Sequence, residues 1–566
     1  MTLVRNPILR GFNPDPSIVR VGEDYFIATS TFEWYPGVQI HRSRDLANWQ
    51  LAARPLRRPS QLDMRGNPDS CGVWAPDLSY ADGRFHLIYT DVKRYGRTTV
   101  DGATGVSLRD FHNYWVWSDR IDGDWSDPVH LNSSGFDPAL FHDDDGRSWL
   151  LNMLWDHRPG HRRFAGIVVQ EMDLWDGRLI GERRVIFEGT SLGFTEGPHL
   201  YKRDGWYHLL VAEGGTGRDH AVVMARSRTL HGPYEVHPDN PVLTARNRSG
   251  ASLARAGHGD LVETPSGETW MVYLCGRPLP DSDRCVLGRE TAIQPMCWGA
   301  DGWLRSPAGD VLPMIEVRVP GQETAPAPAS ANERHDFDEE ALPAAFQWLR
   351  TPHPEQLFSL TERPSHLRLY GRETIGSQFT QSLVARRQQA FSYTVETSVD
   401  VSPANFQHAA GLVCYYNSSK FHYFHVTADD DGNRHLQVMS MLPQEHQNSM
   451  FTSPIPIGPG VIHLRVEVDH ERLRFAYRPD KAVDWCRLPE TFDASILSDE
   501  ATLPGWPNFT GAFVGVACQD MAGSGLTADF DYFHYLERDP VLPNKADELM
   551  LIADRQDSLG DMARPI

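Results

Sequence analysis

The chain of 566 residues is longer than one hydrophobic core usually supports, so we expect two domains or three. Its formal charge of −21 argues against nucleic acid and against an anionic membrane surface as partners, because both bind concentrated lysine and arginine. No apolar run reaches the roughly 18 residues of a membrane span, and the N-terminus contains no apolar secretory segment, so we expect a cytoplasmic protein.

A repeat of about sixty residues organises the first half of the chain. It begins at five short stretches, separated by 60, 62, 60 and 61 positions: DPSIV at residue 15, APDLS at 75, DPALF at 137, GPHLY at 197 and HGDLV at 258. Each stretch precedes a turn and a β-rich run, as in GEDYFIATST and ADGRFHLIYT. The D-G and S-G pairs in these turns are typical of hairpins. Residues 1–320 are therefore predicted to form a five-bladed β-propeller.

The composition changes after residue 320. The segment 321–333, which begins GQETAPAPAS, is rich in proline, alanine and polar residues and is predicted to be a linker. Alternating strands such as FSYTVETSVDV and VIHLRVEVDHERLRFAYRP follow without the repeat and predict a β-sandwich over residues 334–540. Residues 541–566 are a C-terminal tail whose amphipathic stretch DELMLIADRQ is compatible with a helix. The fold class is therefore all-β.

The repeat also brings chemical groups together. The first strand of a propeller blade is the innermost, so equivalent positions of successive blades converge at the central channel. Asp15, Asp137 and His258 share one register, and Glu196 lies one residue ahead of it. Taken singly, the two aspartates are also typical turn residues and Glu196 a solvated side chain, but their common register favours a site. Glycoside hydrolysis needs such a pair of carboxyl groups, one acid and one base or nucleophile.

Several motifs resemble a known family. Three stretches resemble the catalytic triplet of glycoside hydrolase family 43: NPDPSI with Asp15, SSGFDPALF with Asp137 and GFTEGPHLY with Glu196. Its β-xylosidases with an appended concanavalin-like or jelly-roll β-sandwich resemble this chain over residues 5–540, in TSTFEWYPGVQIHRSRDL, CGVWAPDLSY, AEGGT, LGRETAIQ, FTGAFVG and CQD. The resemblance implies an exo-acting, inverting 1,4-β-xylosidase that releases xylose from the non-reducing ends of xylo-oligosaccharides, with α-L-arabinofuranosidase side activity. It implies that Asp15 is the general base, Glu196 the general acid, and Asp137 the group that tunes the pKa of the acid and orients it.

The resemblance further implies substrate-binding residues in the propeller. Phe32, Trp74 and Phe194 would form apolar walls around the terminal sugar, with ordinary core packing as the alternative for each. Arg289 would reach the sugar hydroxyls next to the base, and its alternative is a surface ion pair. Thr216 would offer a hydroxyl near the acid, or it is a turn residue.

His258 resembles the axial histidine of the family, which in some members lies beside a calcium ion on the propeller axis. A histidine satisfied within the core is the alternative. A hard cation with one protein ligand and several waters is chemically reasonable there. We therefore expect no required cofactor, with calcium near His258 as the one candidate metal.

The second domain is expected to take part in the site. Phe513, in GAFVG, resembles an aromatic residue that reaches the pocket from the sandwich and limits it to about two sugar units, although it could equally lie in the sandwich core. Family analogy also suggests a homo-oligomer, a dimer or a tetramer. Seven scattered cysteines without a CxxC pair agree with reduced thiols in the cytoplasm.

Three other functions stay open. An α-L-arabinofuranosidase is the nearest, because xylopyranose and arabinofuranose present similar hydroxyls to a shallow pocket. A non-catalytic glycan-binding propeller would use the same carboxylates only as hydrogen-bond acceptors. A retaining sucrose-type hydrolase is conceivable on fold alone, but fold does not imply function.

Overall fold

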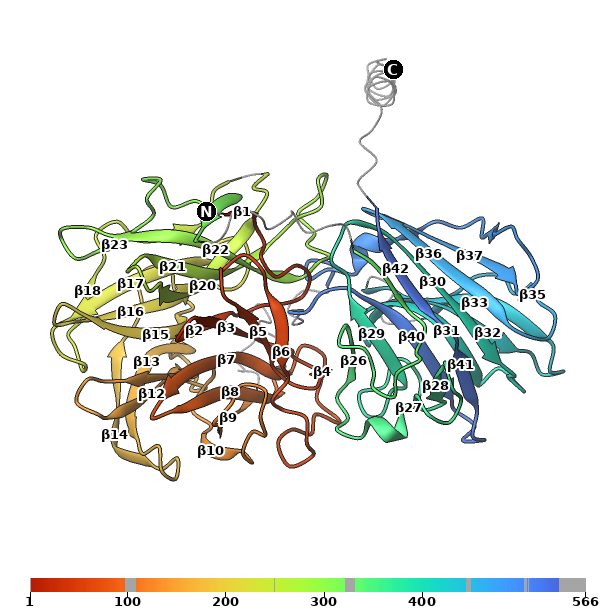
Figure 1. Cartoon of the computed structure of the whole chain (residues 1–566), viewed down its shortest axis with the longest axis horizontal. Coiled ribbons are helices and arrows are strands. Elements are labelled where there is room, and N and C mark those ends of the chain that lie inside the picture. Colours follow the sequence, from red (N-terminus) through yellow and green to blue (C-terminus); the bar gives the residue numbers. More distant parts are fainter. Residues whose placement is uncertain are drawn as a thin grey trace, which may run out of the picture.

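The computed structural model describes residues 2–96, 108–248, 250–320, 331–443, 449–502, 506 and 508–538. These residues form two β-rich bodies, a propeller coloured red to green and a sandwich coloured green to blue (Figure 1). The predicted tail and residues 321–330 of the predicted linker lie outside them, so the exact domain boundary stays a prediction. None of the helices formed by these residues could cross a membrane; two 3-10 helices are η1 (Pro354–Gln356) and η3 (Ala494–Ile496).

The five repeats form five blades, each an antiparallel sheet whose strands follow chain order. The prediction of a five-bladed propeller is confirmed, and each predicted hairpin run forms the second strand of its blade. Blade by blade, the strands are β2 (Ser17–Val21), β3 (Asp24–Thr29), β5 (Gln39–Ser43) and β6 (Gln50–Ala53); β7 (Gly72–Ala81), β8 (Arg84–Arg94), β9 (Asp110–Ser118) and β10 (Val129–Asn132); β11 (Ala139–His142), β12 (Ser148–Trp155), β13 (Phe164–Met172) and β14 (Leu179–Phe187); β15 (Glu196–Arg203), β16 (Trp206–Glu213), β17 (Ala221–Ser227), β18 (Glu235–Val236) and β19 (Leu243–Thr244); and β20 (Ala254–Glu263), β21 (Thr269–Gly276), β22 (Arg289–Trp298) and β23 (Leu304–Arg305).

The innermost strands β2, β7, β11, β15 and β20 form a closed ring, because each contacts the inner strands of both neighbouring blades. The hairpins behind them use the turn chemistry that the sequence predicts. Asp82 and Gly83 have φ values of 50° and 78°, and Asp204 and Gly205 have values of 50° and 74°. Two successive residues with positive φ are the signature of a type I′ turn, which matches the twist of paired strands.

The N-terminal segment joins the first blade to the last. Strand β1 (Thr2–Arg5) pairs with β24 (Glu316–Val319). The side chain of Asn6 donates to the carbonyl of Ile293 over 2.7 Å, and the backbone amide of Asn13 donates to the carbonyl of Arg289 over 2.9 Å. This segment therefore runs along β22, and it joins the start of blade one to blade five.

The second body is a sandwich of two antiparallel sheets around one continuous apolar core. One sheet contains β25 (Asn332–His335), which begins inside the predicted linker, together with β27 (Phe358–Ser359), β28 (Leu367–Tyr370), β30 (Ser392–Val401), β36 (Ile462–Asp469), β37 (Arg472–Pro479), β38 (Cys486–Arg487), β39 (Phe492–Asp493), β41 (Thr527–Phe530) and β42 (Phe533–Glu537). The other contains β4 (Trp34–Tyr35), β26 (Phe346–Leu349), β29 (Leu383–Arg387), β31 (His408–Asn417), β32 (Lys420–Ala428), β33 (Arg434–Met441), β34 (Ser449–Phe451), β35 (Ile455–Pro456) and β40 (Phe513–Asp520). The predicted β-sandwich is confirmed.

The two bodies share a sheet. Strand β4 comes from blade one yet pairs with β26 at the edge of the sandwich (Figure 1). The ring of Trp34 stacks on Phe513 with centroids 3.7 Å apart and an interplanar angle of 13°. The amide of Arg350 donates to the carbonyl of Glu33 over 2.9 Å. These contacts fix the sandwich against the propeller at the face where the inner strands begin.

Candidate active site

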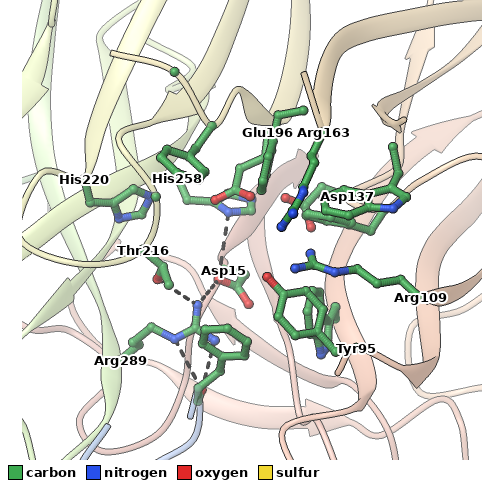
Figure 2. A pocket seen from close by; sticks show the side chains of 18 of the residues that line it. Asp15, Tyr95, Arg109, Asp137, Arg163, Glu196, Thr216, His220, His258 and Arg289 are labelled. Carbon is green, nitrogen blue, oxygen red and sulfur yellow. Dashed lines mark hydrogen bonds and ion pairs between the residues drawn. The ribbon is translucent and has the colours of Figure 1, made fainter. Parts of the chain in front are cut away.

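A cavity of about 640 Å³ opens where the inner strands begin. All five blades and one loop of the sandwich contribute to its wall, parts of which are drawn in Figure 2. The lining residues are Asp15, Phe32, Trp74, Tyr95, Arg109, Phe136, Asp137, Trp155, Arg162, Arg163, Phe164, Gly193, Phe194, Glu196, Gly215, Thr216, His220, His258, Arg289 and Phe509. The structure thus brings together Asp15, Asp137, Glu196 and His258, as the repeat predicts.

An uncommon backbone conformation recurs at the repeat register. Asp15, Asp137 and His258 have φ values of 54°, 52° and 48°, in the left-handed region. Residues other than glycine rarely adopt it, and such strained positions cluster at functional sites. In the fourth blade the register position is Gly197, with φ of 56°.

A side chain at Gly197 would crowd the ring of His258. A Cβ atom there would lie 3.0 Å from both Cε1 and Nε2 of the His258 ring. The register position is therefore crowded for a side chain, and the carboxyl group of this blade comes from the preceding residue, Glu196. The longer glutamate side chain still lines the cavity.

Asp15 is held by two hydrogen bonds at the buried end of the cavity. The hydroxyl of Ser30 donates to its Oδ2 over 2.7 Å, and Nη1 of Arg289 donates to its Oδ1 over 3.1 Å. Nδ1 of His258 lies 3.8 Å from the same Oδ1. The carboxylate is therefore fixed in position beside a cation, as a group that must accept a proton in a defined place requires.

Arg289 connects the last blade to the first blade and to the sandwich. Besides Asp15, its Nη1 donates to the hydroxyl of Thr216 over 3.2 Å. Its Nε and Nη2 donate to the carbonyl oxygen of Phe509, over 3.3 and 2.9 Å. The side chain is buried in the cavity wall, so the alternative of a surface ion pair is wrong.

Asp137 is buried and Glu196 half-buried in the cavity wall, and the pKa values of both carboxyl groups are raised. Burial and the negative charge of Asp15 raise the pKa of Glu196 to about 8. Burial, Glu196 and Asp15 raise the pKa of Asp137 well above its usual range, and the amide of Gly197 donates to its Oδ2 over 3.1 Å. Glu196 therefore carries a proton at neutral pH, the state that a general acid needs. Asp137 contacts the backbone beside this acid and can orient it.

Aromatic rings form the walls that were predicted. The rings of Phe32 and Trp74 lie 5.6 Å apart, and the indole N–H of Trp74 donates to the carbonyl of Ser70 over 3.0 Å. Phe194 is 54% exposed and lies 5.1 Å from the ring of Phe164. Phe194 therefore marks the open side of the cavity, while Phe32 and Trp74 line its interior.

Comparisons with known proteins agree with this geometry. The model of "Glycosyl hydrolases family 43" matches residues 4–304, and that of "Beta xylosidase C-terminal Concanavalin A-like domain" matches residues 334–536. The chain belongs to glycosyl hydrolase family 43. It is 52% identical over 541 residues to xylosidase/arabinosidase 43B of Humicola insolens, covering 94% of this chain and 98% of the relative. It is 48% identical over 549 residues to the β-xylosidase of Bacillus subtilis (strain 168), covering 94% and 100%. The crystal structure of xylan β-1,4-xylosidase from Bacillus halodurans C-125 superposes with a TM-score of 0.89 at 48% identity, covering 94% and 100%.

The prediction that Phe513 reaches the pocket of this family 43 chain is wrong. Phe513 does not line the cavity, because it is fully buried in β40 between Trp34 and Phe12. Phe509, four residues earlier in the same FTGAFVG motif, takes its place, with its ring 5.6 Å from Trp74. The backbone amide of Phe509 donates to the hydroxyl of Ser70 over 3.1 Å, which ties this loop to the propeller. The sandwich does close one side of the pocket, through the loop before β40 instead of the strand.

Other lining residues were not predicted from the sequence. Phe136 and Phe509 lie inside the family motifs SSGFDPALF and FTGAFVG, so these motifs could have indicated them as candidates. Gly193 and Gly215 likewise lie inside GFTEGPHLY and AEGGT. The others lie at strand ends or on connections, outside the repeat register, and belong to no motif: Tyr95, Arg109, Trp155, Arg162, Arg163, Phe164 and His220. Most of them line the side of the cavity formed by blades two and three.

Within the described residues, Asp77, His199 and Asp260 form a group on the propeller axis with the spacing of metal ligands. This group does not fit Ca²⁺, which takes six to eight oxygen ligands. Burial acts to lower the pKa of His199, but the charges of Asp260 and Asp77 outweigh it and raise this pKa to about 9. An imidazolium therefore already supplies the positive charge of this group. Backbone amides of β2 and β11 donate to the two carboxylates over 2.7 and 2.8 Å. Burial lowers the pKa of His258 to about 4, which leaves its ring neutral, and a calcium ion beside it stays a prediction.

Proposed function

We propose that this family 43 chain is an exo-acting β-xylosidase that releases xylose from the non-reducing ends of xylo-oligosaccharides with inversion. The observation that carries the proposal is the set of three carboxyl groups, distant in sequence, that share one cavity of about 640 Å³. The relatives from Humicola insolens and Bacillus subtilis are named as xylosidases, which supports the sugar. The superposed crystal structure is that of a xylan β-1,4-xylosidase, which supports the linkage.

The three carboxyl groups divide the work of an inverting hydrolysis. Asp15 accepts a proton from a water molecule, whose oxygen attacks the anomeric carbon from the side opposite the glycosidic oxygen. Glu196 donates its proton to the glycosidic oxygen as the bond between this oxygen and the anomeric carbon breaks. Asp137 positions Glu196 through the backbone of Gly197. Proton exchange with solvent then restores the ionised Asp15 and the protonated Glu196.

The shape of the cavity supports action at a chain end. Asp15, Arg289 and Phe32 are buried at the closed end, whereas Phe194 is exposed at the mouth. The loop carrying Phe509 covers one side. With one terminal sugar at the closed end beside Asp15, the rest of the oligosaccharide extends through the mouth as the leaving group. The leaving group lies on the reducing side of the cleaved sugar, so the sugar released is the non-reducing terminus.

The decisive test replaces the acid while keeping its shape. Glu196→Gln is expected to lower kcat/KM on xylobiose by about 100- to 10,000-fold, because proton donation to a sugar leaving group is lost. Binding of xylobiose, measured by calorimetry, is expected to persist. Proton NMR of early wild-type turnover is expected to show α-xylose first. First appearance of β-xylose would exclude inversion, and a wild-type protein that binds xylobiose without turnover would support a glycan-binding propeller.

An α-L-arabinofuranosidase is the second candidate, because the relative from Humicola insolens is named for both activities. The ratio of kcat/KM for the nitrophenyl β-xyloside and the nitrophenyl α-L-arabinofuranoside separates the two. A xylosidase prefers the first substrate, and the reverse order would make arabinose release the main reaction.

A further inference from the structure

Arg109 is a fixed cation in the wall of the cavity. It lies immediately before β9, and its guanidinium carbon is 3.6 Å from the ring centroid of Tyr95 and 3.9 Å from that of Trp155. Two rings around one planar group restrict its motion and stabilise its charge. The side chain reaches into the pocket in Figure 2.

This cation has no paired carboxylate within the described part of the chain. No ion pair joins Arg109 to an acidic side chain there, and its buried Nε and Nη1 atoms have no hydrogen-bond partner. Burial lowers the pKa of its guanidinium, Tyr95 and Glu196 act in the opposite direction, and the positive charge of Arg163 lowers it further. Buried N–H groups without an acceptor are unfavourable in the free protein, so a bound anion that accepts from Nε and Nη1 would stabilise this guanidinium.

Two further arginines line the same cavity. Arg162 and Arg163 lie in the connection between β12 and β13, and Figure 2 shows Arg163 and Arg109 pointing into the same part of the pocket. Arg289 is paired with Asp15 at the closed end. A net charge of −21 repels anions from the protein as a whole, so this local group of cations acts against the overall field.

The position of the three arginines assigns them to the leaving sugar. Arg162 is exposed and Arg163 is half-buried, so both are nearer the mouth than the buried Asp15. The charge of Arg109 acts on Glu196, the group that protonates the leaving oxygen. A terminal xylose at the closed end would therefore place the next sugar beside Arg109, Arg162 and Arg163.

We propose that the mouth of this cavity selects an anionic leaving group: a xylo-oligosaccharide whose sugar next to the cleaved bond carries a carboxylate. The carboxylate belongs either to a uronic acid branch on that sugar or to an aldonic acid at its reducing end. Its two oxygens match the planar donor set of a guanidinium, whereas an uncharged hydroxyl accepts one weaker bond. The inference rests on the proposed xylosidase function and adds its substrate class.

The test compares three substrates that share one scissile bond: xylobiose, xylobionic acid, and xylobiose with a glucuronosyl branch on its reducing xylose. We expect kcat/KM for at least one of the acidic substrates to exceed that for xylobiose by about 10-fold or more, because hydrogen bonds to charged groups are the strong ones. The acid that is preferred identifies the source of the carboxylate. Raising the salt concentration from about 20 to about 300 mM should reduce the preference, because an ion pair near a pocket mouth is screened.

Variants locate the effect. Arg109→Gln and the double variant Arg162→Gln/Arg163→Gln should each reduce the preference, and Arg109→Lys should retain part of it because the charge remains. Arg228→Gln is the matched control: Arg228 also stacks on an aromatic ring, 3.8 Å from Trp206, but it does not line the cavity. This control should leave the preference unchanged.

Arg109→Gln has a second readout that a purely structural role would not give. Removing a positive charge that lowers the pKa of Glu196 should move the basic limb of kcat/KM on xylobiose to higher pH. The proposal is overturned if xylobiose is hydrolysed as well as both acids at low salt, or if the preference survives in all the pocket variants. Failure to hydrolyse any of the three would instead overturn the xylosidase function and this inference together.

Discussion

Phe509 is the residue through which the sandwich shapes the pocket, and its removal tests that role directly. Its ring lies between the walls, 6.3 Å from Phe32 and 5.7 Å from Tyr95. In Phe509→Ala the main-chain carbonyl remains, so its hydrogen bonds from Arg289 should persist. The variant therefore removes one wall of the sugar site and leaves the carboxylates in place.

The size of the effect follows from the apolar area that the ring offers a sugar. A contact of roughly 40–80 Å² at about 25 cal/mol per Å² corresponds to about 1–2 kcal/mol, or about 5- to 30-fold in kcat/KM. We expect most of the loss in KM, because the ring contacts substrate before and during the reaction alike. Opening the cavity to water also weakens the burial that raises the pKa of Glu196, so the basic limb should move to lower pH.

Phe513→Ala is the matched control. Phe513 is fully buried and stacks on Trp34 at the junction of the two bodies. Truncation of a buried phenylalanine typically destabilises by about 3–5 kcal/mol, so the melting temperature should fall while KM changes little. Steady-state kinetics on xylobiose and thermal unfolding of both variants provide the comparison. A normal KM in Phe509→Ala together with a raised KM in a still-folded Phe513→Ala would refute the assignment of the pocket wall.

Three further predictions concern the repeat and the axis. The kcat/KM of the wild type on xylobiose should fall with a midpoint near pH 8 as Glu196 loses its proton, and a plateau extending past pH 9 would contradict its role as acid. His199, whose pKa is raised from 6.5 to about 9, should add on the order of 3 kcal/mol of stability that is fully present below pH 6.5 and lost as pH rises through 9. Urea unfolding of wild type and His199→Gln should therefore differ most at pH 6 and least at pH 9.5, and a constant difference would exclude this linkage. Gly197→Ala should lower kcat with only a small change in the melting temperature, because the new Cβ meets the ring of His258. Adding His258→Ala should restore part of the lost kcat.

The repeat allowed the catalytic end of the propeller to be predicted because its geometry is periodic. A spacing of 60 to 62 residues carries the same backbone position from blade to blade. Asp15, Asp137 and His258 therefore meet although they lie on three different blades. The turn pairs could be predicted for a similar reason, because Asp-Gly adopts the required positive φ values at Asp82 and Asp204.

The sandwich side of the pocket could not be predicted as well. Phe509 and Phe513 stand in one short motif, and alternation along β40 does not reveal which of them leaves the sheet and reaches the propeller. The pairing of β4 with β26 involves only two residues of blade one, too few to show a period. Arg109 lies immediately before β9 and Trp155 ends β12, both outside the repeat register, so no spacing along the chain relates the two residues.

The departure of Glu196 from the register has a physical explanation in the fifth blade. His258 occupies the space that a side chain at position 197 would need, and its Nδ1 lies 3.8 Å from Asp15. A side chain at the register position would crowd this ring, which favours a carboxyl group contributed by the neighbouring residue of the fourth blade. Glu196 lies at the first position of β15, next to the glycine whose amide binds Asp137. The same glycine thus makes room for the imidazole and connects the backbone of the acid to the carboxyl that orients it. A symmetric ring of five equal positions would hold like groups at like distances. The one-residue offset changes the position of the acid relative to the base, and the spacing of these two groups is what distinguishes inverting from retaining enzymes.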